Sequence, residues 1–261
     1  IALLLNFSFI RVFFQSFVAI FILILFGFFI NLGINEVVLK AFLTWFPAII
    51  LSIIFLRNHS ITLTIQILSI ITIFFLAIFY FYISDPSYFW NQILTEISDI
   101  LLNNGFEEQA NSIQSQINII AEQMTIIIAI TYWSLYSFVL LLGEAIYRSS
   151  LKEALNSGNF VALNLGRSLA IFAAISSLCL FIFEAEWLKN IAYLSFMFFW
   201  LQGLAIFHWL YINGVLPKFG LVALYVIMPF FNILMVMLLA VLGYTDAWFN
   251  LRSKVKPIKN Q

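Results

Sequence analysis

The sequence predicts an all-α fold, a polytopic transmembrane helical bundle, and two observations lead to that class. The first is composition: 64% of the residues are hydrophobic and only 9% are charged. Soluble domains carry roughly 25% charged residues, so this chain cannot cover a folded surface with polar groups, and lipid must cover most of it. The second is that the apolar residues form long continuous runs, whereas a membrane β-barrel shows short alternating segments.

The few charged residues divide the apolar sequence into about seven runs, each of which we expect to cross the bilayer. A helix needs about 20 apolar residues to span the hydrocarbon core, and the last two runs exceed that length. The expected spans are 12–30, the run between Lys40 and Arg57, 61–83, 124–143, 168–183, 190–217 and 219–245.

Between the third and fourth spans lies the one long polar segment, Ser84–Gln123, which holds six acidic residues and no basic one. Its apolar residues recur at helical spacing, and Asn104 and Gly105 interrupt them as a turn. Asp85 and Pro86 mark the end of the preceding span. We expect two amphipathic helices, either lying on the membrane surface or folding back over the bundle, with the second continuing into the fourth span.

The remaining global features set limits on the kind of protein. Net charge is zero, so nothing indicates nucleic acid as a partner. Basic residues divide evenly between the two sides of a seven-span topology, so the positive-inside rule favours neither orientation. The four basic residues of 252–259 favour a cytoplasmic tail.

No linker divides residues 1–261, which we expect to form one integral membrane domain. The apolar start Ile1–Leu5 resembles the end of an upstream membrane helix, which predicts a truncated N-terminus.

Four polar residues in the last two spans are the candidate ligand-binding set: Gln202, His208, Tyr225 and Asn232. Polar and ionisable groups at membrane depth are functional candidates. Three of them have a structural alternative. His208 could lie at headgroup level, Gln202 could form an interhelix hydrogen bond, and Asn232 could bond a carbonyl group that Pro229 leaves free.

Catalytic and cofactor chemistry have no signature in the sequence. There are two histidines, far apart, and one cysteine, so we expect no metal site. No Gly-rich phosphate loop occurs. We therefore expect neither a cofactor nor enzymatic activity. Glu144 and Arg148 stand at i,i+4 and are expected to pair at the end of the fourth span, while Arg167 opens the fifth.

The C-terminal segment suggests a turn followed by a short interfacial helix. Gly243 suits the left-handed position that ends a helix. Asp246 then suits the N-cap of a helix over Ala247–Arg252. The alternative is a role for its charge, either in ion coupling or in a pair with Arg167 or Arg252. The two interpretations differ in how well asparagine would replace Asp246.

Three stretches together resemble one family, the YybS-like bacterial membrane proteins. The stretches are Gly143–Arg148 leading through Asn159 and Phe160 to Leu165–Arg167, then Leu201–His208, and Leu242–Arg252. Asn156–Asn159 departs from the Asn-Pro-Gly-Gly-like turn of many members. The resemblance implies the bacterial inner membrane and, distantly, a likeness to the S components of energy-coupling-factor transporters. That likeness implies a small-molecule pocket and separate ATPase and coupling subunits as partners, beside the lipid bilayer.

Two function hypotheses follow. The first is a small-molecule-binding or transport subunit, motivated by the polar residues of the last two spans and by the resemblance. The second is a structural or partner-binding membrane protein, motivated by the amphipathic segment Ser84–Gln123. A polar cavity reaching Gln202 and Asn232 would favour the first hypothesis, and a tightly packed bundle there would oppose it.

Overall fold

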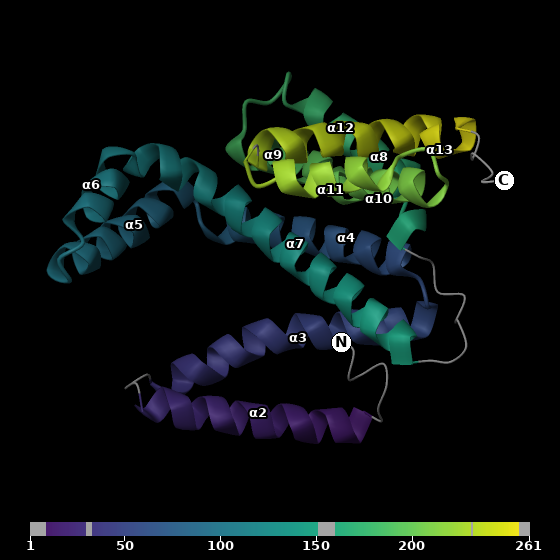
Figure 1. The fold of residues 1–261 in the computed structure, drawn as a ribbon. Coiled ribbons are helices and arrows are strands. Elements are labelled where there is room, and N and C mark those ends of the chain that lie inside the picture. Colours follow the sequence, from purple (N-terminus) through teal and green to yellow (C-terminus); the bar gives the residue numbers. More distant parts are fainter. Residues whose placement is uncertain (1–8, 30–32, 151–159, 231, 256–261) are drawn as a thin grey trace. The chain divides into compact units, whose positions relative to one another are not determined.

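The computed structural model describes residues 9–29, 33–150, 160–230 and 232–255, and within these ranges all regular structure is helical (Figure 1). The all-α prediction is confirmed. In chain order the helices are α2 (Phe9–Phe29), α3 (Ile34–Asn58), α4 (Ile61–Tyr82), α5 (Pro86–Asn103), α6 (Glu107–Ser115), α7 (Ile117–Ser150), the 3-10 turn η1 (Phe160–Ala162), α8 (Gly166–Cys179), α9 (Glu186–Met197), α10 (Phe199–Ile212), α11 (Lys218–Ile227), α12 (Asn232–Phe249) and α13 (Leu251–Lys254).

Among the described residues, four helical stretches are long and apolar enough to cross a membrane: Asn35–Asn58, Ile61–Tyr82, Ile117–Tyr147 and Glu186–Ile212. They differ in how much of their surface the protein covers. The apolar window of Glu186–Ile212 is 78% buried, against 24–33% for the other three. The stretch formed by α9 and α10 is therefore a core element, whereas the other three turn most of their apolar surface outwards.

The count of seven spanning helices is not confirmed, because two of the expected runs form shorter helices. The fifth run forms α8, whose 14 residues rise only about 21 Å at 1.5 Å per residue. The run 219–245 was expected as one helix, and this is wrong: it divides into α11 and α12. Pro229 lies at the division, and proline has no N–H to donate and clashes with the carbonyl of the residue four positions earlier.

The polar segment forms helices on either side of a turn, as expected, and α5 and α6 pack together as a hairpin. Asp85 Oδ1 accepts a hydrogen bond from Tyr88 N at 2.9 Å, and Pro86 occupies the first turn of α5. Gly105 turns the chain with a φ of +81°, a conformation that glycine adopts without strain. α6 then packs beside α5 (Figure 1). An additional break at Gln116, which the sequence pattern did not predict, separates α6 from α7.

The contacts of the chain divide it into two compact units. Unit 1 comprises Ile1–Leu68 and Ser134–Leu163. In its described part α2 packs on α3. Tyr136 Oη donates a hydrogen bond to the carbonyl oxygen of Thr44 at 3.0 Å, which joins the last part of α7 to α3.

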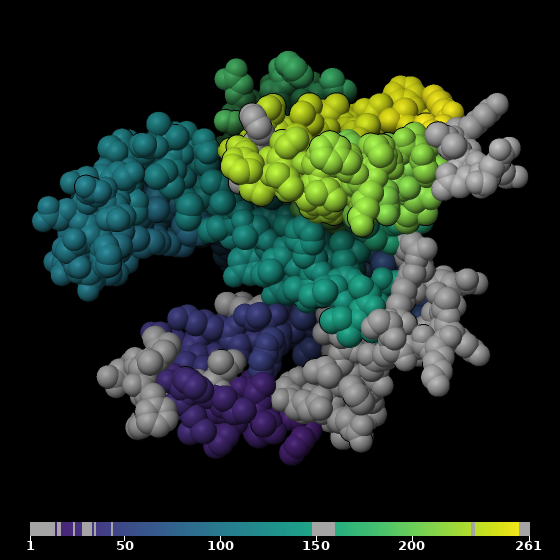
Figure 2. All heavy atoms as spheres, in the orientation of Figure 1, coloured from purple at the N-terminus to yellow at the C-terminus, as the bar shows by residue number. Residues whose placement is uncertain are grey.

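Unit 2 comprises Ser69–Trp133 and Asn164–Gln261, and its fully buried side chains include Trp133, Phe198 and Leu201. In it α10 packs on α12 and α8 packs on α9. Trp133 lies against Phe198 with ring centroids 4.7 Å apart, and its Nε1 donates to Ser69 Oγ at 3.0 Å. Figure 2 shows the atoms of the C-terminal helices, in light green and yellow, lying against one another on the face shown.

Candidate functional site

Two glycines bring the backbones of α10 and α12 into contact. A Cβ atom added to Gly203 would lie 2.0 Å from the carbonyl oxygen of Leu239, and one added to Gly243 would lie 2.0 Å from that of Phe199. Each glycine therefore faces the backbone of the opposite helix, and no other residue fits at either position. Small residues at helix interfaces permit this close approach in membrane proteins.

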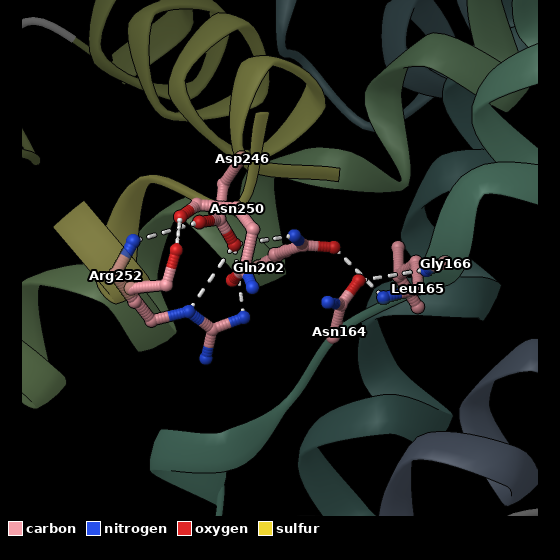
Figure 3. A network of polar contacts seen from close by, with 8 residues as sticks. Asn164, Leu165, Gly166, Gln202, Asp246, Asn250 and Arg252 are labelled. Atoms are coloured by element: carbon pink, nitrogen blue, oxygen red, sulfur yellow. Dashed lines mark hydrogen bonds and ion pairs between the residues drawn. The ribbon is translucent and has the colours of Figure 1, made fainter. Parts of the chain in front are cut away.

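Gln202 lies beside this contact, fully buried, and both ends of its amide have protein partners (Figure 3). Its Nε2 donates to Asp246 Oδ2 of α12 at 2.8 Å. Its Oε1 accepts from the backbone N–H of Leu165, just before α8, at 2.7 Å. One side chain of α10 therefore links α12 to the start of α8, as the interhelix interpretation of Gln202 predicts.

Asp246, also fully buried, is the centre of the network. Arg252 donates to its Oδ2 from Nη2 at 2.9 Å and from Nε at 3.2 Å. The Arg252 side chain is only 10% exposed. The backbone N–H of Arg252 approaches Asp246 Oδ1 at 3.4 Å. A carboxylate shielded from water is thus neutralised by a guanidinium six residues later, the arrangement that a buried charge requires.

Asn250 allows the chain to reverse direction between Asp246 and Arg252. It adopts the left-handed conformation, with φ +47°, and its N–H donates to the Asp246 carbonyl at 2.8 Å. Asparagine tolerates this conformation better than most residues. Helix α12 ends here, and the following residues fold back so that the Arg252 side chain reaches Asp246 (Figure 3).

The start of α8 is held in the same network. Gly166 has a φ of +80°, and its N–H donates to Asn164 Oδ1 at 2.9 Å. Amides in the first turn of a helix have no partner within the helix, so they need partners outside it. Asn164 and Gln202 supply acceptors for Gly166 and Leu165, respectively.

The prediction of a helix end at Gly243 and a cap at Asp246 is wrong. Helix α12 runs through both residues to Phe249. Gly243 is required by the close approach of α10 and not by a positive φ. Asp246 forms an ion pair, and of the two arginines considered as its partner, Arg252 is the one that contacts it. Sequence spacing could not reveal the facing backbone of Phe199 or the buried position of Asp246.

His208 and Tyr225 form a separate polar pair. His208 Nε2 and Tyr225 Oη share a hydrogen bond of 2.7 Å between α10 and α11. Tyr225 is 45% exposed and His208 is half-buried. Three of the four candidate ligand-binding residues are therefore divided between two pairs, Gln202 with Asp246 and His208 with Tyr225. The side chain of the fourth, Asn232, lies outside the described residues.

The other candidate residues lie on α7 and α8. Glu144 is buried, at 5% exposure, in α7. The side chain of its expected partner, Arg148, lies outside the described residues. Arg167 is exposed in the first turn of α8.

Sequence reasoning missed a second polar cluster in unit 2. Tyr80, near the end of α4, accepts a hydrogen bond at its Oη from Asn190 Nδ2 of α9. The carboxylate of Glu186 accepts from Tyr80 Oη at 3.5 Å and from Ser87 Oγ at 3.4 Å. These contacts attach the start of α9 to the base of the hairpin. The only available signal was a polar Asn190 at the start of an apolar run.

The network is a buried ion pair, Asp246 with Arg252, to which the side-chain amide of Gln202 is hydrogen-bonded. In the part of the chain that the structure describes, no three His, Cys, Asp or Glu side chains gather as a metal site would require. No protein-family model, curated protein or solved structure matches the chain, so an assignment of function has to rest on the contacts of its own residues.

Proposed function

We propose that this chain is a multi-pass protein of the bacterial cytoplasmic membrane that works by binding a protein partner and has no catalytic activity. Membrane insertion is supported by the outward faces of its helices. On α4 alone, Ile70, Phe74 and Phe75 are each more than 60% exposed. Soluble monomers rarely expose continuous apolar surface of this kind, and lipid is the solvent that suits it.

The proposal extends to the finer topology. We place α2, α8 and the pair α11–α12 in the bilayer beside the four longer helices, which retains seven membrane segments. α8 and α11 are too short to cross alone, because about 20 residues are needed. They would reach partway across, with their ends satisfied by neighbouring helices such as α10.

The observation that carries a partner-binding function is that the buried polar network is complete within the protein. Gln202 has a partner at each end of its amide, and Asp246 is neutralised by Arg252. Gly203 and Gly243 bring the helix backbones together at the same level. Because these contacts leave the Gln202 amide satisfied, we assign the C-terminal helices a scaffold role and place binding elsewhere on the molecule.

Native mass spectrometry of the protein, released gently from lipid nanodiscs, tests this function. The expected result is a complex with a second protein, in stoichiometric amount. A bound small molecule with no second protein would contradict the proposal and favour the alternative below.

That alternative is a small-molecule-binding or transport subunit, which the resemblance to S components implies together with ATPase and coupling subunits. The pair His208–Tyr225 favours it, because both side chains are partly accessible and offer a hydrogen-bonding imidazole and phenol across two helices. His208→Phe and Tyr225→Phe should then remove a co-purifying small molecule. Asp246→Asn provides a comparison that disturbs a buried structural pair instead.

A further inference from the structure

The helical hairpin α5–α6 is braced on one side by contacts within unit 2. Trp90 Nε1 donates to Thr125 Oγ1 at 2.7 Å, which ties α5 to α7. Further along α5, Ser98 Oγ donates to the carbonyl oxygen of Ala110 in α6 at 3.2 Å. Leu94 lies between these positions on the same face and is 6% exposed. Since residues four apart share a helix face, the face through Trp90, Leu94 and Ser98 is occupied.

A second apolar row on α5 is left outside this packing. Ile93, Ile97 and Ile100 stand at i, i+4 and i+7, the spacing by which one helix packs against another in a coiled coil. Ile93 is half-buried, Ile97 is 40% exposed and Ile100 is 60% exposed. We name these three residues the isoleucine seam. In Figure 2 the hairpin, in dark teal, presents its side chains on the face shown.

Acidic residues accompany the seam. Glu96 is exposed and stands three residues after Ile93 and four before Ile100, so it flanks the row. Asp99, Glu107 and Glu108 are exposed on the same hairpin. The whole segment Ser84–Gln123 has six acidic residues and no basic one.

This charge selects among the surfaces that could cover the seam. An anionic lipid surface attracts basic segments and repels an acidic one. A second copy of the hairpin would bring like charges together, which costs free energy. A helix with lysine or arginine beside its own apolar row satisfies both the spacing and the charge, because flanking charges of opposite sign set partner choice in paired helices.

We propose that the isoleucine seam docks a basic amphipathic helix of a partner protein, with Glu96 pairing with its lysine or arginine side chains. This inference rests on the partner-binding function proposed above and adds the place and the chemistry of the contact. The hairpin follows α4 and precedes α7, whose 34 residues rise about 51 Å, more than the roughly 30 Å hydrocarbon core. We place the hairpin in water, where a partner can reach it, because its exposed acidic residues are costly to move out of water.

The test uses the full chain in nanodiscs of zwitterionic phosphatidylcholine and two synthetic helical peptides. Both peptides carry the same leucine and isoleucine seam, flanked by lysine in one and by glutamate in the other. The lysine peptide should bind, and the glutamate peptide and empty nanodiscs should not. Ile97→Ser with Ile100→Ser should weaken binding roughly tenfold. Glu96→Gln should weaken it about two- to fivefold, as expected for one exposed ion pair.

Ile119→Ser provides the matched control, because Ile119 is also 60% exposed but lies on α7. It should leave peptide affinity unchanged. Equal binding of the two peptides, or equal losses from the Ile100 and Ile119 substitutions, would overturn the site. Two other results would also overturn the site. The first is that a fluorophore attached at Ile100→Cys, in a Cys179→Ser background, becomes buried on anionic phosphatidylglycerol vesicles. The second is that the chain forms a dimer which the seam substitutions dissociate.

Native mass spectrometry distinguishes a failure of the isoleucine seam from a failure of the proposed partner-binding function. A protein partner that native mass spectrometry still finds on the Ile97→Ser, Ile100→Ser variant would preserve the partner-binding function and contradict the seam. Absence of any protein partner from the unchanged chain would contradict the function itself. Circular dichroism of the variants confirms that the hairpin remains helical, so loss of binding reports on the contact.

Discussion

At the residue scale, the C-terminal helices depend on a few side chains that water does not reach. Asp246 is fully buried, and its charge is balanced by Arg252, whose side chain is 10% exposed. Gln202 connects the pair to the start of α8. Ions removed from water are costly unless they are paired, so the loss of one partner leaves the other uncompensated.

Replacing Asp246 tests whether its charge or its shape matters. Asp246→Asn removes the charge and keeps the size, so it should destabilise the protein nearly as much as Asp246→Ala, by about 3–5 kcal/mol. Thermal unfolding in nanodiscs measures both variants. Adding Arg252→Gln to Asp246→Asn should recover part of the loss. Full stability of the single asparagine variant would show that a hydrogen bond suffices and that the charge contributes little.

The two interface glycines allow a steric prediction. Gly243→Ala and Gly203→Ala each place a methyl group 2.0 Å from a backbone carbonyl oxygen of the facing helix. Backbone atoms in a packed helix cannot move aside as a flexible side chain can, so each change should cost about 1–3 kcal/mol or more. Gly33→Ala is the control, since its nearest new contact is 3.9 Å. Equal melting temperatures for all three variants would contradict the close packing of α10 and α12.

At the element scale, the hairpin α5–α6 is the part of the chain whose local sequence and structure agree most fully. Asp85, Pro86 and Gly105 act at the positions where short-range rules place them. The break at Gln116 was not predictable, because no glycine or proline marks it and residues on both sides favour a helix. The division between α11 and α12 had a visible cause in Pro229, because a proline in a helix interior removes one backbone hydrogen bond and clashes with the carbonyl four residues earlier.

The turn at Gly105 provides a test of the hairpin. With a φ of +81° and open space around it, Gly105→Ala adds backbone strain and no collision. That strain costs roughly 1–2 kcal/mol. Amide hydrogen exchange should become faster over Glu107–Ser115 and remain unchanged in α12. Gly105→Asn should have a smaller effect because asparagine tolerates the left-handed conformation. Uniformly fast exchange of the unchanged hairpin would show that it is not a stable element.

At the scale of the whole molecule, three candidate spans keep much of their apolar surface outward, while Glu186–Ile212 is enclosed. This contrast marks α9 and α10 as the enclosed core of unit 2, while the outward apolar faces of the other three suit lipid. Helix length and hydropathy identify candidates for crossing a membrane. Length and hydropathy do not place α8 and α11 in the bilayer, because helices this short need neighbouring helices to satisfy the backbone groups at their ends.

Cysteine accessibility tests this arrangement in membrane vesicles. In a Cys179→Ser background, Asn104→Cys in the hairpin turn should react with a membrane-impermeant maleimide from one side of the membrane only. Phe74→Cys, on the outward face of α4, should remain unlabelled until detergent is added, because lipid covers it. Rapid labelling of Phe74→Cys in intact vesicles would place α4 in water and contradict the membrane topology.

The sequence by itself determined the helical class, the two helices on either side of the turn at Gly105, and the identity of the chemically unusual residues. These follow from composition, periodicity and short-range backbone rules, which act within a few residues. The tertiary structure alone decided what those residues do. Gly243 was assigned a turn and instead meets the backbone of Phe199, and Asp246 was assigned a cap and instead neutralises Arg252 beside Gln202. Such roles depend on atoms that are distant along the chain, and only the packing of helices brings them together.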